Sequence, residues 1–563
     1  MKTLVLGTIP DNFSPETHLP LGPWCFVKRE DIYPDWESLS FESDPFTTPD
    51  ELAEAATSTS AYANSLIPLL TEQLNKENRT FHSEKFWRLL IMPWLLYLVQ
   101  TTWERQCRLK QFLQKYQSQA LRVELVKDSA NWEFSDTVDF VSRGILNPDY
   151  SEWLYSRMLV RNLPPAWQGS YVEKSTGYNS LLNPKPTWKT WIKDAISSRL
   201  RCSGVYGIGP VNSILWSLFL SMKPAGRCSV VGQFDSKETN TELNWMLDFQ
   251  KLLQSALPVC FKDIRNLGGR KKKIKAKLGK INLIGPIIWY HESKQLNLAY
   301  RVESGEKLIL TQHGGNYGEL KSAPLISEIE YKQSGFLSWG WDKHQDYAGN
   351  IYAAASPYLG DFRDKHCQTN DELVFVGTLA NLLCLRLDST PQALQQLDYR
   401  KSKCDFLNSI KPALFEKTLY RPYPNEDGAL KDRSYFERKF PNLKILEGDL
   451  YTRLMKCKLL ALDHPVTTLS VALAANVPMV GFWDNKAWVM CRQAILYFEA
   501  LQKAGVFFET GKAAAEQVNK VWDDVQGWWM QSEIQEARNA WCYQYARTSK
   551  LWWRDWMRVL WKL

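Results

Sequence analysis

The sequence predicts an α/β protein in which two doubly wound, Rossmann-like domains face each other across a cleft. The chain has 563 residues, more than the roughly 250–300 residues that one hydrophobic core serves. In the second half, short apolar runs alternate with short helical segments, which is typical of parallel strands joined by right-handed crossovers. A further apolar run at 2–8, ending before Pro10, is typical of a central parallel strand near the N-terminus.

The second half has the clearer rhythm. We expect strands at 372–378, 442–446, 459–463 and 478–482, and helices at 397–409, 449–456 and 467–475. The run at 414–421 leads outward to Arg421 and the prolines that follow it. Together these segments predict a second domain over 346–525, followed by a C-terminal aromatic-rich helix over 526–563.

The first half mixes strands with long helices. We expect strands at 2–8, 120–126, 280–289 and 307–311, a strand pair at 326–338, and helices at 49–75, 83–116, 187–200 and 211–222. Gly204, Gly207 and Gly209 predict a turn between packed helices, because their spacing is not that of a dinucleotide-binding loop. The periodicity fades near 342–356, so we place the first domain at 1–345.

Composition excludes several classes of protein. The 11 cysteines form no C-x-x-C pair, which argues against a disulfide framework or a zinc site. The most apolar window, 86–99, contains Arg88 and Pro93 and is shorter than the ~20 residues of a membrane-spanning helix. The apolar stretch at the N-terminus is too short for a signal peptide. We therefore expect a cytoplasmic protein.

Basic residues and tryptophans concentrate locally. Eight lysines and arginines lie between Arg265 and Lys280, which indicates either a solvated loop or contact with an anionic membrane or glycan. No nucleic-acid-binding motif accompanies them, so no nucleic-acid partner is expected. The tryptophans crowded between Trp522 and Trp561 suit a helix that packs on one side and stays exposed to water on the other, or one that lies at a membrane interface.

The segment from Asp463 to Thr468 predicts an anion-binding turn. It follows an expected strand and opens an expected helix, and ligands of doubly wound sheets bind beyond the carboxyl ends of the strands. A helix N-terminus offers unpaired N–H groups and a positive dipole end, and Thr467 and Thr468 add hydroxyl groups, with Ser470 one turn further on. The alternative is that Thr467 only caps the helix and His464 only fills a loop.

A second cluster lies at Gln312–Gly318, directly after the expected strand 307–311. Its glycines, among them Gly314 and Gly315, allow the backbone to approach a ligand, while His313 and Tyr317 supply a titratable ring and a phenol, with Asn316 between them. A hairpin turn with a buried histidine is the alternative. The candidate acid–base residues at this side of the cleft are His313, Glu319 and Asp342, and their spacing does not choose among them.

Three further residues are candidates for ligand contacts. Arg421 ends a strand-like run, where its guanidinium suits a phosphate or carboxylate, although an arginine on a proline-stiffened loop explains it equally well. Near the N-terminus, Asn12 and Trp24 follow the first expected strand and could stack on or bond to a ligand. A structural role for both is the alternative.

The order of elements in the second half resembles the donor-binding half of GT-B glycosyltransferases, in which a Thr or Ser that grips phosphate begins the helix. The pair His464-Pro465 resembles GT-B transferases that use CMP-activated ulosonic acids. Together with the Leu-Gly-Pro-Trp-Cys motif at 21–25, the loop 312–318 and the Trp-rich ending, these motifs make the whole chain similar to a family of transferases found in bacterial O-antigen and other surface-polysaccharide gene clusters.

This resemblance implies a GT-B glycosyltransferase with its acceptor side in 1–345, where Asn12 and Trp24 would face the acceptor, and its nucleotide-sugar site in 346–525. It also implies that the C-terminal helix, 526–563, packs back on the first domain, with a peripheral membrane contact as the alternative. It implies transfer from a nucleotide-activated donor, a CMP-linked ulosonic acid such as Kdo or a nonulosonic acid, to a glycan or lipid-linked glycan acceptor, with peripheral contact to the inner membrane. No cofactor and no metal ion are expected, since no Asp-x-Asp stands in a suitable context. The expected nucleotide-binding residues are His464, Pro465, Thr467, Thr468, Arg421 and Ser470. The alternatives are a nucleotide-sugar epimerase of GT-B fold and a non-catalytic carbohydrate-binding or assembly protein.

Overall fold

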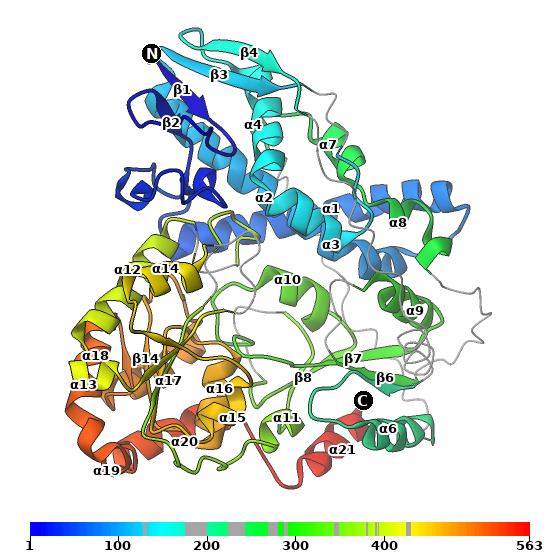
Figure 1. The fold of residues 1–563 in the computed structure, drawn as a ribbon. Coiled ribbons are helices and arrows are strands. Elements are labelled where there is room, and N and C mark those ends of the chain that lie inside the picture. Colours follow the sequence, from blue (N-terminus) through cyan, green and yellow to red (C-terminus); the bar gives the residue numbers. More distant parts are fainter. Residues whose placement is uncertain are drawn as a thin grey trace.

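The protein is an α/β molecule with three parallel sheets (Figure 1). The computed structural model describes residues 1–127, 132–174, 200–222, 243–267, 280–285, 291–342, 348–378, 381–388, 391, 393–423 and 430–563. The predicted helix 187–200, the end of the predicted strand 280–289 and most of the basic run 265–280 lie outside these residues. We call the sheets N-terminal, middle and C-terminal, in the order in which the chain forms them.

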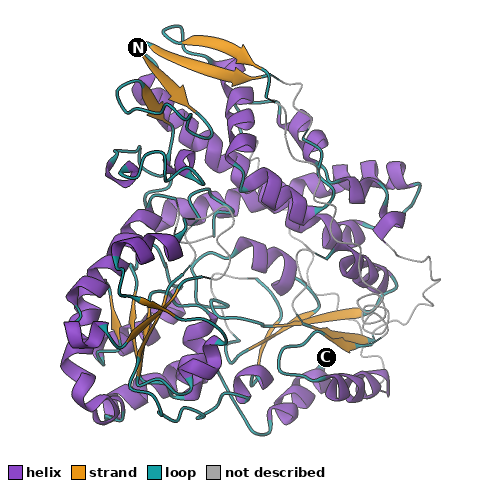
Figure 2. Cartoon of the chain, in the orientation of Figure 1, coloured by secondary structure: helices purple, strands orange, loops and turns teal. Residues whose placement is uncertain are grey.

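The sequence predicts two sheets, whereas the described residues form three, and the N-terminal sheet is the additional one. Its strand order is β2 (His18–Pro20), β1 (Lys2–Val5), β3 (Leu121–Val126) and β4 (Gln168–Val172), so the first strand pairs with neighbours from its own region and not with 307–311. The hairpin of long helices α1 (Pro49–Asn78) and α2 (Glu84–Tyr116) separates this sheet from the other two (Figure 2). A capping box formed by Thr48 and Glu51 begins α1, and Ser83 caps α2.

The middle sheet has the order β5 (Cys202–Ser203), β6 (Ile281–Ile284), β7 (Lys307–Thr311), β8 (Gly335–Ser338) and β9 (Ile351–Ala353). Its side chains alternate between two cores, since Leu308 and Leu310 join the main core and Ile309 joins a second core on the other face. Helix α9 (Glu292–Glu303) packs against β7, and α6 (Pro210–Met222) supplies Trp216 and Leu220 to the second core.

The strand pair predicted at 326–338 is wrong in its first half. Residues Pro324–Ile326 form the short helix α10 and Ser327–Tyr331 a π-helical turn, and only Gly335–Ser338 is a strand. Pro324 at the first helical position favours this start. Strand β9 pairs with β8, so the middle sheet continues beyond residue 345 to Ala353.

The C-terminal sheet has the order β12 (Lys444–Ile445), β11 (Thr418–Arg421), β10 (Leu373–Val376), β13 (Leu459–Leu462), β14 (Met479–Phe482) and β15 (Phe507–Phe508). Counted along the chain this is 3-2-1-4-5-6, the doubly wound Rossmann order, whose direction reverses between β10 and β13. Its helices are α12 (Gln395–Ser409), α14 (Asp432–Lys439), α15 (Leu450–Leu454), α16 (Thr467–Ala475), α17 (Arg492–Lys503) and α18 (Gly511–Val521).

The remaining described helices are α3 (Thr137–Asp139), α4 (Pro148–Asn162), α7 (Phe249–Ala256), α8 (Val259–Lys262), α11 (Pro357–Gly360), α13 (Pro412–Phe415) and α19 (Val525–Trp529). Within the described ranges, no helix combines the length and the apolarity needed to cross a bilayer.

The tail is not the single helix expected from residue 526 onward. It forms α20 (Ser532–Tyr545), which packs on α16 and α17, and α21 (Trp552–Lys562), which lies against the middle sheet. The helix is interrupted at Arg547, because its backbone N–H bonds the Trp339 carbonyl and its carbonyl accepts from Ser356. Figure 1 shows the result, with the C-terminus beside α6.

Candidate functional site

The two predicted halves of the site touch each other. The loop 312–318 follows β7, and the N-terminus of α16 follows β13, so the carboxyl ends of the middle and C-terminal sheets meet. The Gly315 N–H donates to Thr467 Oγ1 at 3.1 Å. A Cβ on Gly315 would lie 2.6 Å from the Val466 carbonyl carbon, so only glycine permits this approach.

Asp463 and His464 form a buried dyad at the end of β13. His464 Nδ1 lies 2.6 Å from Asp463 Oδ1, and the two residues are 5% and 0% exposed. Because the carboxylate accepts from Nδ1, the proton-exchanging position of the ring is Nε2. Nε2 has no hydrogen-bond partner among the described residues, so it is available to a ligand.

Asp463 is itself held at the point where the strand order reverses. Its Oδ2 accepts a hydrogen bond at 3.2 Å from the N–H of Thr378, which follows β10. The same oxygen lies 3.4 Å from Lys403 Nζ. Lys403 is 1% exposed, and its Nζ also contacts Asp432 Oδ2 at 2.6 Å. Burial disfavours the ammonium, but Asp432 and Asp463 together raise the pKa of Lys403 above its ordinary value. A buried network of ion pairs between Lys403, Asp432 and Asp463 therefore supports the candidate site.

The ion pairs continue away from the site. Asp432 Oδ1 lies 2.8 Å from Arg400, and Arg400 reaches Glu37, 2.5 Å away in the segment between β2 and α1. Burial by itself would raise the pKa of Asp432, but Lys403 and Arg400 hold it below its ordinary value. A chain of alternating charges thus links the N-terminal segment to His464.

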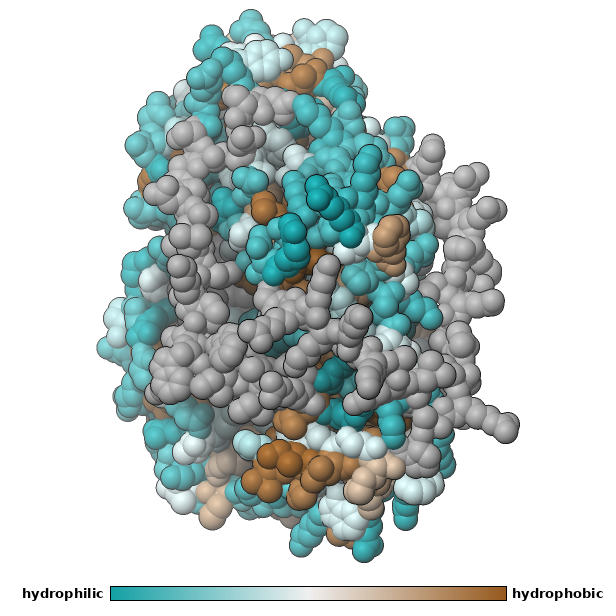
Figure 3. Space-filling view, turned by 90° about the vertical axis from the view of Figure 1, so that its right-hand side faces the viewer, coloured by the Kyte–Doolittle hydropathy of each residue, from teal (hydrophilic) through white to brown (hydrophobic). Residues whose placement is uncertain are grey.

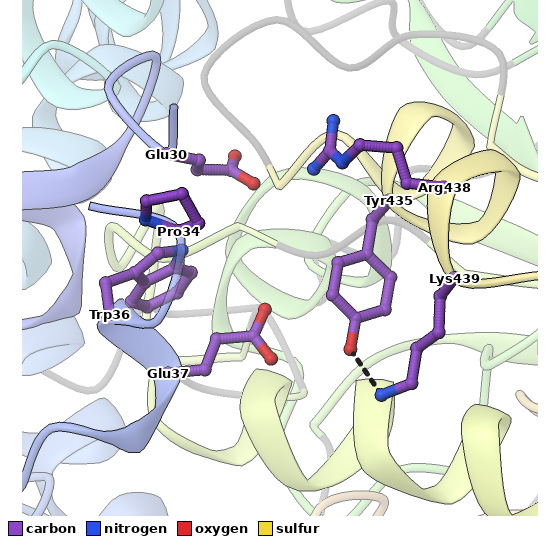
Figure 4. A pocket seen from close by; sticks show the side chains of 7 residues that line it. All are labelled: Glu30, Pro34, Trp36, Glu37, Tyr435, Arg438 and Lys439. Atoms are coloured by element: carbon purple, nitrogen blue, oxygen red, sulfur yellow. Dashed lines mark hydrogen bonds between the residues drawn. The ribbon is translucent and has the colours of Figure 1, made fainter. Parts of the chain in front are cut away.

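A cavity of about 220 Å³ lies at the far end of this chain (Figure 4). It is lined by Glu30, Pro34, Trp36, Glu37, Tyr435, Arg438 and Lys439. Burial raises the pKa of Glu30. None of the predicted site residues lines this cavity.

The N-terminus of α16 is open to an anion. Its N-cap residue, Val466, supplies no capping side chain, so the N–H groups of Thr467 and Thr468 keep their donor capacity, whereas that of Leu469 donates to the Val466 carbonyl. Thr467 Oγ1 accepts from Gly315, which leaves its hydroxyl proton to donate. Pro465 and Thr468 are buried in the turn. Ser470, one turn further on, is 1% exposed, and its Oγ has no hydrogen-bond partner among the residues that the structure describes.

On the opposite side, His313 belongs to a second relay. Its Nδ1 lies 2.8 Å from Tyr317 Oη, which donates to Glu330 Oε1 at 3.2 Å. Burial lowers the pKa of His313 to about 4, so the ring is neutral near pH 7. Burial, with Glu330 beside it, raises the pKa of Tyr317, which therefore keeps its proton.

Sequence reasoning missed an aromatic group beside this relay. The Tyr206 ring lies 6.0 Å from that of His313 and 5.8 Å from that of Tyr358. Tyr451 stands within hydrogen-bonding reach of both Tyr358 and Thr468, so phenols connect the two sheets. Isolated tyrosines carry no sequence signal, and only their meeting identifies them.

The turn between helices that was predicted at Gly204, Gly207 and Gly209 is wrong. They follow strand β5, so they form a strand-end loop next to the candidate site and not a turn between helices. Gly207 has φ +76°, and a Cβ there would lie 2.3 Å from the Tyr358 backbone nitrogen. This close approach explains the glycine and positions Tyr206.

Arg421 lies at the same edge of the C-terminal sheet as the dyad, but other predicted residues lie elsewhere. Its Nη1 donates to the Leu446 carbonyl at 2.8 Å. Trp24 is a core residue of the N-terminal region, stacked on Tyr155, and Asn12 is exposed in that region. Asp342 is exposed after β8, without a hydrogen bond or ion pair to any described residue.

Glu319 is buried behind the loop 312–318. It is 1% exposed, and neither carboxyl oxygen has a hydrogen-bond partner within the described chain. Burial raises the pKa of its carboxyl group well above the ordinary value, although the Asn316 N–H opposes the shift. Asn316 itself has φ +71°, a left-handed conformation that asparagine tolerates. The assignment of Glu319 as an acid–base residue stays a prediction.

Comparison with known proteins decides the class. The sequence profile described as LIC12162 family transferase matches residues 2–560, nearly the whole chain. The chain belongs to this family of transferases. No curated protein is similar enough to the transferase to match it. In the parts of the transferase that the structure describes, no three His, Cys, Asp or Glu side chains are grouped to hold a metal ion.

Proposed function

We propose that this transferase is a GT-B-type glycosyltransferase whose nucleotide-sugar donor binds where the middle and C-terminal sheets meet. The observation that carries the proposal is the pairing of Asp463 with the Thr378 N–H, at the reversal of a 3-2-1-4-5-6 sheet. Ligands of such sheets bind outside the carboxyl ends of the strands at this point. The opposing loop from the middle sheet then supplies the sugar side of the cleft.

The proposed phosphate site is the N-terminus of α16. Uncapped N–H groups, the Thr467 hydroxyl and His464 Nε2 lie there together. Arg421 adds a cation at this edge. These groups offset phosphate charge without a metal ion, so we expect transfer to persist in EDTA.

The proposed sugar side holds His313 as a neutral, hydrogen-bonding ring, positioned by Tyr317. A group with a pKa of about 4 is a weak base at neutral pH. His464, backed by Asp463, is therefore the stronger candidate for proton transfer as the donor bond breaks. The donor class, a CMP-linked ulosonic acid, is taken from the resemblance of His464-Pro465, and the acceptor from the resemblance to surface-polysaccharide transferases.

The test measures thermal unfolding of the transferase with CMP, UDP or GDP. We expect CMP to raise the unfolding temperature and UDP and GDP to leave it unchanged, because a ligand stabilises only the folded state that it binds. His464→Ala should lose the CMP effect, whereas His366→Ala, whose ring bonds the Cys457 carbonyl away from the cleft, should keep it.

A transfer assay with a panel of activated sugars completes the test. His464→Ala should reduce transfer by roughly 10²-fold or more, as removal of an acid–base group does. Full activity in this variant would move the donor site elsewhere. Stabilisation by UDP alone would keep the fold assignment and refute the CMP-linked donor.

A further inference from the structure

Helix α6 carries an apolar stripe on the side that faces away from the protein. Its exposed residues are Val211, Ile214, Leu215, Leu218 and Met222, of which Val211 and Met222 are 71% and 77% exposed. They recur at helical spacing along one face. The inward side carries Ser213 and Ser217 beside Trp216 and Leu220. A surface helix normally shows the reverse pattern, so the outer face requires a partner.

Helix α21 extends this surface. Trp216 of α6 lies 6.2 Å from Trp552 and 6.0 Å from Trp556, and Phe219 lies 6.5 Å from Trp561, all as ring-centroid distances. Trp561 is 67% exposed, so the apolar surface continues across both helices. Figure 3 shows the aliphatic part of this surface, on α6, as a brown patch towards the lower edge of the molecule.

Basic side chains border the patch. Arg554, Arg558 and Lys562 are exposed on α21, and the acidic residue of that helix, Asp555, is only partly exposed and lies 4.0 Å from Arg558. The Arg554 guanidinium lies 5.2 Å from the centre of the half-exposed Trp553 ring. Apolar residues, tryptophans and a basic border together are typical of helices that lie in a membrane interface.

We propose that α6 and α21 form a docking surface for a bilayer that contains anionic phospholipids. The apolar stripe enters the headgroup boundary, and the arginines and lysine pair with lipid phosphates. A second copy of the chain is a poorer occupant, because two-fold pairing of this surface would bring like charges together. Tyr206, four residues before α6, lies beside His313, so docking brings the candidate site close to the lipid.

The test is cosedimentation of the full-length protein with phosphatidylcholine vesicles, with and without phosphatidylglycerol. We expect binding that requires phosphatidylglycerol and weakens with salt. Leu215→Glu with Leu218→Glu should abolish binding. The matched control, Leu69→Glu with Leu496→Glu, alters two leucines that are also exposed, on α1 and α17, and should bind as the unmodified protein does.

Charge is tested separately. Arg554→Gln with Arg558→Gln should weaken partitioning into phosphatidylglycerol vesicles about thirtyfold, since each basic residue near such a surface contributes about a fivefold factor. Lys512→Gln with Lys520→Gln, exposed on α18, should leave partitioning unchanged. Circular dichroism of each variant confirms that it is folded.

Two outcomes would overturn the proposal. The first is failure of the unmodified, folded protein to bind either vesicle. The second is a dimer, seen by light scattering, that the Leu215→Glu and Leu218→Glu changes convert to monomer while vesicle binding is absent. Neither outcome bears on the proposed sugar chemistry, which the nucleotide experiments test without lipid.

Discussion

The two histidines of the candidate site show how surroundings divide one residue type into two roles. His464 donates through Nδ1 to the carboxylate of Asp463, whereas His313 contacts the phenol of Tyr317. Burial keeps the His313 ring neutral near pH 7. In the proposed function, the two rings lie on opposite sides of the donor, His464 at the phosphate and His313 at the sugar.

His313 predicts a pH dependence of stability. Its folded pKa of about 4 lies below the ordinary value of 6.5, so the unfolded chain binds this proton more readily. The unfolding free energy should therefore fall as pH drops from 6.5 towards 4, by up to about 3 kcal/mol for this group.

His313→Gln should remove that contribution. Guanidinium unfolding of both proteins at a series of pH values measures the difference between them, which should shrink only in this window. Curves that stay parallel from pH 7 to pH 4 would show that folding does not lower the pKa of His313.

At the scale of elements, the contact between the loop after β7 and the start of α16 decides the geometry of the site. Both segments were predicted separately as ligand loops. Their backbones approach so closely at Gly315 and Val466 that each one orients the other.

Gly315→Ala should therefore separate the two sheet edges. The added methyl would overlap the α16 backbone, and we expect a cost of about 1–3 kcal/mol together with an at least tenfold loss of transfer. Gly360→Ala is the control, because no other atom lies within 4 Å of a Cβ there. Equal activity in the two variants would mean that the loop and α16 act independently.

A second contact between elements joins α21 to the core on the outer face of the middle sheet. Trp556 is 3% exposed and donates through Nε1 to the Ala355 carbonyl at 2.9 Å. Trp556→Ala should cost about 3–5 kcal/mol, whereas Trp561→Ala, on the exposed side, should change stability by less than about 0.5 kcal/mol. Chemical unfolding measures both. A small effect at Trp556 would mean that α21 does not complete the second core.

For the whole molecule, the buried ion pairs matter most because they join separate regions. Arg400 is 1% exposed and connects Glu37, near the N-terminus, with Asp432 in the C-terminal part. Such a chain contributes less to net stability than to fixing one arrangement, since desolvation offsets much of the attraction.

A double-mutant cycle checks this link. Arg400→Met alone should destabilise by about 3–5 kcal/mol, because it leaves Asp432 buried with one cation fewer. Combined with Glu37→Gln, it should reveal a coupling of about 1 kcal/mol. The exposed pair Lys401 and Asp405, replaced by Met and Asn, should couple by under about 0.5 kcal/mol. Additive effects at Arg400 and Glu37 would refute the link.

Local pattern was enough for much of the fold. Helix α16 begins and ends at the predicted residues, and α1, α2, β3 and β7 match within a few residues, because strand and helix periods are properties of short segments. Periodicity could not identify Lys403, which contacts Asp463, or the phenol of Tyr358, since both residues are far from His464 and His313 in the chain.

The amino-acid order alone therefore determined that this is an α/β protein. It also pointed to two segments, 312–318 and 463–468, as carriers of the candidate site residues. The tertiary structure decided that β1 belongs to a third sheet, that the tail is interrupted at Arg547, and that Gly315 meets Thr467. The reason is that periodicity records which face of a segment is buried. It does not record which distant segment buries it.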